Sequence, residues 1–178
     1  MTKKLFAAAL IGAAIFITGC SDDAEDFNDT PKVAQAMSKQ MPTFSATNLD
    51  GQPVTNEIFA SKKITIVNIW GTFCPPCIGE MPELGELARN MPADAQLIGL
   101  VCDAESNSPQ IQDAKKILRD AGANFVNIVP DENLMRFLND VDAVPTTIFV
   151  NSKGEIVGQK IVGADVDGYK DELAKLLK

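Results

Sequence analysis

The sequence predicts a three-layer α/β/α domain built around a central mixed β-sheet. Short apolar runs rich in β-branched residues alternate with longer segments of helical periodicity, as in strands joined by crossover helices. The chain then closes with the pattern of a β-hairpin and a final helix, which adds antiparallel strands to the sheet. Its 178 residues, 46% hydrophobic and 22% charged, fit one globular domain with a short appendage.

The first 19 residues have the pattern of a secretory signal. Lys3 and Lys4 precede an apolar run over residues 5–17, which is shorter than the roughly 20 residues of a membrane-spanning helix. The run leads into Ile-Thr-Gly-Cys, which resembles the bacterial lipobox. We therefore expect cleavage of residues 1–19 and a lipid on Cys20. An ordinary cleaved signal and an uncleaved anchor helix are the alternatives.

Residues 20–41 are expected to form the lipidated start of the mature chain and an acidic flexible tether. Acidic residues are frequent and large apolar residues are few in its first half, a composition that does not support a packed core. The amino-acid composition changes near Met41, and the predicted globular domain covers residues 42–178.

The first half of this domain should contain a hairpin, a buried strand and a helix. The hairpin covers residues 44–54, and the strand is the apolar, β-branched run at 64–69. The helix begins near residue 74 and runs to about residue 90. Pro82 lies inside it and should kink it, because proline lacks the backbone N–H that the helix uses.

The second half should contain more strands and helices in alternation. Ser108 and Pro109 have the pattern of an N-cap followed by the first helical residue, and Gly122 has that of a helix end. The other expected elements are strands at 96–101 and 125–129, a short helix at 133–139, a hairpin at 146–161 and a last helix from about residue 167.

The motif Cys74-Pro75-Pro76-Cys77 stands where the strand at 64–69 gives way to a helix. A CxxC alone is a weak signal, because zinc sites also use it. At a helix start, however, free backbone N–H groups and the helix dipole stabilise a thiolate, and thiols so placed titrate at about pH 3.5–7.5. Cys74 is therefore the expected nucleophile. Cys77 is less exposed and is placed to attack and resolve a mixed disulfide.

Three stretches of the chain together resemble the thioredoxin superfamily, and within it the TlpA/ResA-like group of extracytoplasmic reductases. They are Ile66-Val67-Asn68-Ile69-Trp70-Gly71-Thr72-Phe73-Cys74-Pro75-Pro76-Cys77, Glu80-Met81-Pro82 and Val144-Pro145-Thr146-Thr147-Ile148-Phe149. The resemblance covers residues 42–178. It implies a thioredoxin-like fold with an N-terminal β-hairpin and an inserted strand–helix segment between the second and third stretches.

The resemblance also implies which residues contact a substrate. Pro145 would be a cis-proline facing the cysteines, with Val144 offering backbone hydrogen bonds to a substrate chain. Trp70 is expected both in the core and at the rim of the site. The remaining predicted substrate contacts surround the cysteines: Phe73, Pro75 and Pro76.

Two positions depart from the family pattern. Phe73 stands where the family usually has tryptophan, and Gly71 where it usually has alanine. These departures bear on substrate preference more than on the chemistry of the cysteines.

Glu80 is the predicted acid–base group. Cytoplasmic thioredoxins carry a buried aspartate where this chain has Asn68, whereas Glu80 lies one helical turn after Cys77 on the same face. The resemblance implies that this glutamate tunes the cysteine pair. We expect it to handle the proton of Cys77, with a pKa raised by partial burial. The alternative is a solvated glutamate of the first helical turn.

Cys102 follows the predicted strand at 96–101 and is the odd cysteine of the domain. A lone cysteine is most often a small buried hydrophobe, and we interpret it so. Because α/β proteins gather their sites at the carboxyl ends of strands, a resolving thiol or an intermolecular link stays open.

The favoured function is the reduction of disulfides in extracytoplasmic partner proteins, with an upstream membrane thiol donor that restores the Cys74–Cys77 dithiol. No cofactor or metal is expected beyond this redox-active pair. The formal charge of −8 and the absence of histidine argue against nucleic-acid binding and against histidine-based metal sites. The lipid on Cys20 would hold the protein in the bacterial cell envelope. Cytochrome c maturation, sulfoxide-reductase recycling as an antioxidant activity, and general disulfide reduction all suit the family.

Three other functions stay open. The same disulfide chemistry could run in the oxidase or isomerase direction, which depends on reduction potential and partner. A peroxiredoxin-like peroxidase is the second, although its Thr-x-x-Cys pattern is not met, since Thr72 lies only two residues before Cys74. A metal-binding module is the third, although two cysteines leave two tetrahedral positions unfilled.

Overall fold

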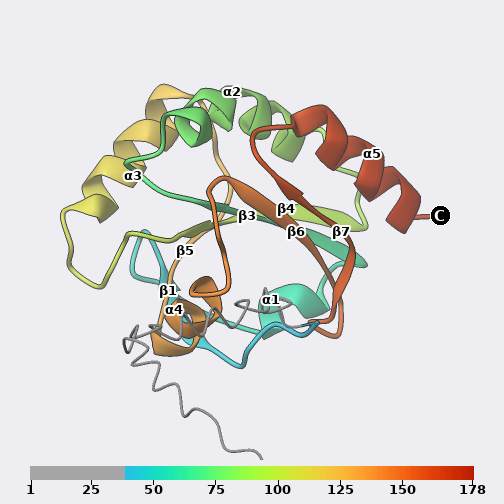
Figure 1. The fold of residues 1–178 in the computed structure, drawn as a ribbon, viewed down its shortest axis with the longest axis horizontal. Coiled ribbons are helices and arrows are strands. Elements are labelled where there is room, and N and C mark those ends of the chain that lie inside the picture. Colours follow the sequence, from blue (N-terminus) through green and yellow to red (C-terminus); the bar gives the residue numbers. More distant parts are fainter. Residues whose placement is uncertain (1–38) are drawn as a thin grey trace, which may run out of the picture. The chain divides into compact units, whose positions relative to one another are not determined.

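The structure is a computed structural model that describes residues 39–178. The predicted signal, Cys20 and most of the predicted tether lie outside the described residues. A seven-stranded mixed sheet, in the order β2-β1-β5-β4-β3-β6-β7, forms the middle of the domain (Figure 1). Its strands are β1 (Ser45–Asn48), β2 (Pro53–Thr55), β3 (Ile64–Trp70), β4 (Ala95–Val101), β5 (Asn127–Val129), β6 (Thr146–Asn151) and β7 (Ile156–Val162).

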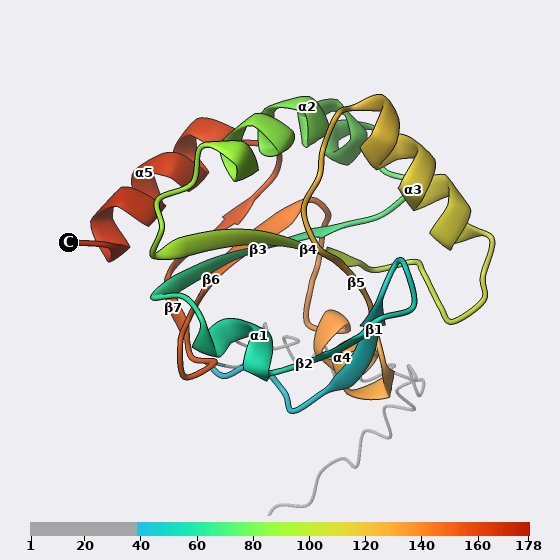
Figure 2. The same ribbon diagram turned by 180° about the vertical axis from the view of Figure 1, so that it is seen from behind.

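Helices cover both faces of the sheet, which confirms the predicted three-layer α/β/α class. The two groups of helices lie on opposite faces, as the views from the front and from behind both show (Figures 1 and 2). The first group is α2 (Pro75–Arg89), α3 (Gln110–Asp120) and α5 (Val166–Leu176); the second is α1 (Glu57–Ala60) and α4 (Glu132–Leu138).

Parallel and antiparallel strands divide the sheet. The central strands β3, β4 and β5 run parallel, so their carboxyl ends meet at one edge, which is where an α/β sheet places its site. The hairpin strands β6 and β7, and the hairpin strands β1 and β2, flank them in antiparallel register. The segment β5–α4 supplies the predicted extra strand–helix unit between the CxxC helix and Pro145.

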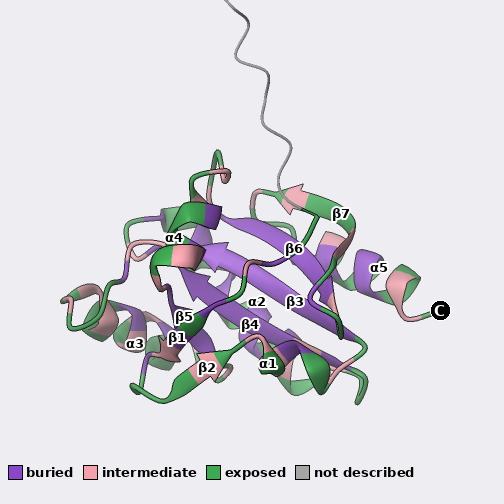
Figure 3. Cartoon of the chain, turned by 90° about the horizontal axis from the view of Figure 1, so that it is seen from below, coloured by how far each residue is buried: buried purple, intermediate pink, exposed green. Residues whose placement is uncertain are grey.

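Strand β3 separates two hydrophobic cores, because its side chains alternate between the faces. Ile66 and Trp70 pack under α2, α3 and α5, whereas Val67 and Ile69 pack against the α1 and α4 side. Every residue of β3 is buried, as the continuous purple of the central strands shows (Figure 3). Asn68 shares the face of Ile66 and Trp70, so the strand turns this polar side chain towards α2.

Local details differ from the sequence-based expectations at two places, the start of α3 and the helix α1. Helix α3 has Pro109 as its N-cap, one residue later than predicted, because the Ser108 hydroxyl accepts the N–H of Glu105 (3.1 Å) and does not cap the helix. Helix α2 does contain Pro82 in its interior, and the kink expected there stays a prediction. The four-residue helix α1 was not predicted, since it is too short to show a helical period.

The domain takes in residues just before the predicted boundary at 42. Gln40 forms an antiparallel bridge with Glu155, and Met41 is buried in the core of the α1 and α4 side. Within residues 39–178, no helix is both long and apolar enough to cross a membrane.

Candidate redox site

Cys74 and Cys77 are joined by a disulfide at the start of α2, with their Cα atoms 5.3 Å apart. Cys74 is the N-cap of the helix, and the backbone N–H of Cys77 donates to its sulfur over 3.2 Å. Cys74 is 4% exposed and Cys77 is fully buried. Cys74 is thus the more exposed of the two cysteines, as expected, although little of its surface is accessible in the disulfide form. The helix start thus directs a backbone donor at the first sulfur, where it stabilises negative charge.

The loop before the cysteines is fastened to the end of β4. The Asp103 carboxylate accepts the Thr72 N–H (3.0 Å) and its hydroxyl (2.5 Å). A Cβ at Gly71 would lie 2.6 Å from the Phe73 ring and 3.2 Å from the Cys102 sulfur, so a side chain there would make the exposed Phe73 ring move aside. The two departures from the family pattern, at positions 71 and 73, are therefore neighbours in space. Sequence reasoning missed Asp103, which shows no local pattern.

The Val144–Pro145 peptide bond is cis, as the resemblance implied. The Cys74 sulfur lies 3.5 Å from the carbonyl oxygen of Val144, so this loop covers the first cysteine. On its far side, the Pro145 carbonyl accepts the N–H of Gly163 (2.8 Å), which ties the loop to the segment between β7 and α5. Pro75 and Pro76 are exposed at the start of α2.

The prediction for Trp70 needs correction. The core part is confirmed, since the side chain is 0% exposed and its indole N–H donates to the Asn127 side chain over 2.8 Å. The rim part is wrong for this structure, because the alternation of β3 turns the indole under α2 instead of towards solvent. Phe73 is the aromatic residue at the rim, with 67% of its surface exposed.

Glu80 lies in a buried polar network under the cysteine helix. It is 4% exposed, so it is not a solvated first-turn glutamate. The amide of Asn68 donates to its Oε1 (2.9 Å) and the hydroxyl of Tyr169 to its Oε2 (3.0 Å). The Asn68 amide also donates to the Thr147 hydroxyl (3.0 Å), while its Oδ1 is buried without a partner among the described residues.

Burial raises the pKa of the Glu80 carboxyl, and the hydrogen bonds from Asn68 and Tyr169 offset part of that rise. The nearby charge of Glu83 raises it further. This direction agrees with the sequence-based expectation. A small pocket of about 160 Å³ lies beside Glu80, with Gly79, Glu83, Ala164 and Val166 among its other lining residues.

Sequence reasoning missed Tyr169 and Thr147. Tyr169 is the chain's single tyrosine and is fully buried. The available signal was its spacing: Tyr169, Leu173 and Leu176 follow the period of one helical face, so Tyr169 should point inwards with them. A buried tyrosine needs a hydrogen-bond partner. Nothing in the local pattern identified that partner as Glu80.

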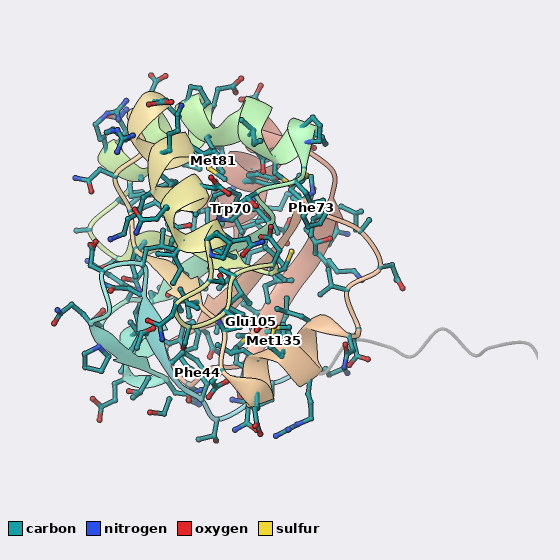
Figure 4. All side chains as sticks on the ribbon, turned by 90° about the vertical axis from the view of Figure 1, so that its left-hand side faces the viewer. Phe44, Trp70, Phe73, Met81, Glu105 and Met135 are labelled. Atoms are coloured by element: carbon teal, nitrogen blue, oxygen red, sulfur yellow. A yellow bond between two sulfur atoms is a disulfide. The ribbon has the colours of Figure 1, made fainter. Side chains whose placement is uncertain are left out.

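A groove of about 470 Å³ opens beside the site. Figure 4 shows Phe73 near the start of α2 and Met135 on α4, which both line it. Cys102, Leu138, Val141 and Val144 are also among its lining residues. The groove is therefore mostly apolar and reaches the loop that covers Cys74.

Cys102 is a free, partly buried thiol that packs against the core of the α1 and α4 side. Burial, together with the charge of Asp103, raises the pKa of this thiol to about 11. It stays neutral near pH 7, which fits a small hydrophobic residue better than a reactive one.

The model of the Redoxin family matches residues 36–177 of this chain. Among similar proteins, the thiol:disulfide interchange protein DsbE of Haemophilus influenzae is 29% identical over 161 residues, covering 88% of this chain and 84% of that protein. The thiol-disulfide oxidoreductase ResA of Halalkalibacterium halodurans is 30% identical over 145 residues, covering 79% of this chain and 76% of that protein.

Solved structures share the fold at lower identity. A thioredoxin-family thiol:disulfide interchange protein from Chlorobium tepidum matches with a TM-score of 0.61 and 22% identity, over 78% of this chain and 92% of that one. StoA from Bacillus subtilis matches with a TM-score of 0.60 and 17% identity, over 76% and 99%. These matches confirm the thioredoxin-like fold.

Proposed function

The chain belongs to the Redoxin family and is a TlpA/ResA-like thiol–disulfide oxidoreductase, and on this basis we propose that it reduces disulfides in partner proteins outside the cytoplasm. Its redox group is its own cysteine pair. The observation that supports the proposal most directly is the N–H of Cys77 directed at the sulfur of Cys74, at a helix start, with Cys77 itself fully buried.

The proposed reaction has two exchange steps. The Cys74 thiolate attacks one sulfur of the partner's disulfide, forms a mixed disulfide and releases the other sulfur as a thiolate. The Cys77 thiolate then attacks the Cys74 sulfur and releases the partner's second thiolate. The partner gains two electrons and two protons, and the protein is left with the Cys74–Cys77 disulfide. An upstream membrane thiol donor reverses the change by the same exchange.

Glu80 is the proposed proton acceptor for Cys77. Cys77 must lose its proton before the second step, yet it is fully buried and has no direct contact with water. Glu80 follows it by one turn of α2, and burial raises the pKa of its carboxyl, which makes it a better proton acceptor than an ordinary glutamate. The pocket beside Gly79 and Ala164 is the proposed route of that proton to solvent.

The partner chain is proposed to lie across the start of α2. The backbone of Val144, next to cis-Pro145, would form hydrogen bonds with it, and the exposed Phe73, Pro75 and Pro76 would contact it beside the cysteines. The groove behind Phe73 would take an apolar side chain of the partner.

The direction of electron flow is tested by the reduction potential of the pair, measured by equilibration with glutathione or dithiothreitol. A reductase should have a potential close to that of thioredoxin, about −270 mV, instead of the roughly −120 mV of the oxidant DsbA. A value near the second figure would favour the oxidase direction. A peroxidase is less well supported, because the Thr72 hydroxyl already donates its hydrogen to Asp103.

The proposed location is the cell envelope, with a lipid on Cys20 as anchor. The support is the signal pattern in the sequence together with the TlpA/ResA-like membership, which also makes cytochrome c maturation a candidate pathway. Mass spectrometry of the membrane-bound protein should find a diacylated Cys20 at the mature N-terminus. Cys20→Ala should leave an unlipidated precursor, and normal lipid attachment in that variant would contradict the assignment.

A further inference from the structure

The hydroxyl of Tyr169 stands between the buried carboxyl and the loop that supports cis-Pro145. Its oxygen lies 3.0 Å from Oε2 of Glu80 and 2.8 Å from the carbonyl oxygen of Gly163. The backbone N–H of Asp165 donates to it over 3.3 Å. Burial raises the pKa of Tyr169 to about 12, so the hydroxyl keeps its proton throughout the working range of the protein.

One proton cannot serve both acceptors fully. A phenol donates a single hydrogen, and the Gly163 carbonyl can only accept. When Glu80 is ionised, the charged carboxylate is the stronger acceptor and draws the Tyr169 proton. When Glu80 is protonated on Oε2, its own O–H donates to the Tyr169 oxygen, and the Tyr169 hydrogen turns to the Gly163 carbonyl. This change of hydrogen-bond partner needs only a rotation of the Tyr169 hydroxyl.

Gly163 connects the hydroxyl of Tyr169 to the loop that contains cis-Pro145. Its carbonyl faces Tyr169, while its N–H donates to the Pro145 carbonyl over 2.8 Å. Its φ of +96° lies in the region that favours glycine, so this backbone conformation is specified by the sequence. A continuous chain of hydrogen bonds therefore runs from Glu80 through Tyr169 and Gly163 to Pro145.

We propose that Tyr169 is a positioning residue that holds the Glu80 carboxyl and couples its protonation to the hydrogen bonds behind cis-Pro145. The inference rests on the proposed function in one respect, the role of Glu80 as the proton acceptor for Cys77. In the cycle, the arrival of a proton on Glu80 strengthens the bond from Tyr169 to Gly163 while the partner is being released. The departure of that proton restores the bond to Glu80.

The groups that face Glu80 define the expected pH response. Asn68 donates from β3 and Tyr169 from α5, while Cys77 and Glu83 lie on its own helix. Both donors stabilise the ionised carboxyl, whereas burial and the Glu83 charge oppose it. Removal of the Tyr169 hydroxyl should therefore raise the pKa of Glu80. A hydrogen bond to a charged group corresponds to a shift of about one to two pH units.

The first measurement uses the wild-type, full-length chain. Tyr169 is the only tyrosine, so a ¹³Cζ tyrosine label gives one NMR signal from the chain. This signal and the Gly163 amide should shift together over the pH range in which the Glu80 carboxyl carbon titrates. Both shifts should vanish in Glu80→Gln. A tyrosine signal that stays flat while Glu80 titrates would overturn the proposal.

The second measurement uses Tyr169→Phe, which keeps the ring and removes the hydroxyl. The Glu80 titration should move to higher pH, and the Gly163 amide should no longer follow it. Thr65→Val is the matched control, because it removes a buried hydroxyl at the other end of β3, and it should move neither. An unchanged Glu80 titration in folded Tyr169→Phe would overturn the proposal; if that variant does not fold, the wild-type titration decides.

The exchange rate separates this inference from the proposed function. If Glu80→Gln leaves the pH profile of disulfide exchange unchanged, the role of Glu80 in catalysis fails, while the NMR coupling between Glu80, Tyr169 and Gly163 can still be present. If the profile changes in Glu80→Gln but the tyrosine signal is flat, the coupling fails and the catalytic role stands.

Discussion

The two faces of the sheet are packed differently, although the same strands form both. Under α2, α3 and α5, the core contains the cysteine pair and a buried network of Asn68, Glu80 and Tyr169. Under α1 and α4, the core is made of apolar side chains such as Phe44 and Phe59, whose rings meet edge to face with centroids 6.1 Å apart. The first face thus contains the cysteine pair and a buried carboxyl, whereas the second is mainly apolar, with buried polar groups such as the Thr65 hydroxyl paired to Gln96.

The third thiol makes the same contrast. Cys102 packs with the apolar face and has a pKa raised to about 11, whereas Cys74 receives a backbone N–H at the start of a helix. Two sulfur atoms at the same edge of the sheet are thus expected to differ in reactivity, because one is given a donor and the other is given a nearby carboxylate. The reactivity of a thiol at this edge of the sheet is therefore expected to depend on the groups directed at its sulfur, and not on its place in the sheet.

The largest effect is expected from the cysteines of the redox face. Cys77→Ser should stop the second exchange step and accumulate mixed disulfides with partner proteins in the cell envelope. Cys74→Ser should trap almost nothing, because it removes the attacking sulfur. The measurement is non-reducing electrophoresis followed by mass spectrometry of the linked proteins, which also identifies the pathway. Equal trapping by both variants would break the assigned order of attack.

The next effect should be one of stability alone. Phe59→Ala on the apolar face removes a side chain that is 1% exposed, and its loss should lower the free energy of unfolding by about 3–5 kcal/mol. Urea unfolding measures this loss. The pH profile of exchange by the folded variant should match that of wild type. A shifted profile would mean that the two faces are not independent.

Glu80→Gln should change the pH behaviour of the redox face. The pKa of Glu80 is raised above its usual value of 4.5 in the folded protein, so this group favours folding in its protonated form. Its stabilising contribution to the free energy of unfolding is fully present below pH 4.5 and is lost as the pH rises through the pKa of Glu80 in the folded protein. The variant should therefore gain stability relative to wild type as the pH rises.

The rate of disulfide exchange by Glu80→Gln near neutral pH should fall by at least about tenfold. This lower bound is cautious, because a general acid–base group usually contributes about a hundredfold or more. Thermal unfolding of the oxidised forms and stopped-flow exchange, both as functions of pH, check the two effects. A stability difference that does not depend on pH would contradict the raised pKa.

Cys102→Ser should have the smallest effect. Since Cys102 is a neutral packing residue, exchange by the variant should stay within about twofold of wild type, and trapping by Cys77→Ser should persist when the two changes are combined. Exchange kinetics and the same trapping experiment test this. If trapping disappears with Cys102, that residue takes part in the chemistry.

Much of the fold was predictable because its signals are local. The apolar run that forms β3, the proline-containing helix start at Cys74 and the turn before β7 each show a pattern within a few residues. Helix α1 was missed because four residues show no period. For Trp70, the core part of the prediction was right and the rim part was wrong. The alternation of a strand fixes which face a residue joins, but the sequence did not reveal how completely α2 covers that face.

The site was predictable only in part, for a physical reason. Cys74, Cys77 and Glu80 lie within two turns of one helix, so their proximity follows from helical geometry. Tyr169 reaches Glu80 from α5, and Asp103 reaches Thr72 from the end of β4. Those contacts depend on how distant elements pack, and no spacing within either element encodes them.

The central claim is that Cys74 is the stabilised, attacking thiolate and that Cys77 is shielded. The most direct measurement is alkylation of the fully reduced, full-length chain with iodoacetamide at a series of pH values, followed by peptide mass spectrometry of each cysteine. We predict that Cys74 is modified rapidly well below pH 8.5, the range of an ordinary thiol, while Cys77 and Cys102 stay largely unmodified. Faster modification of Cys77, or a Cys74 that reacts only above about pH 8.5, would contradict the account.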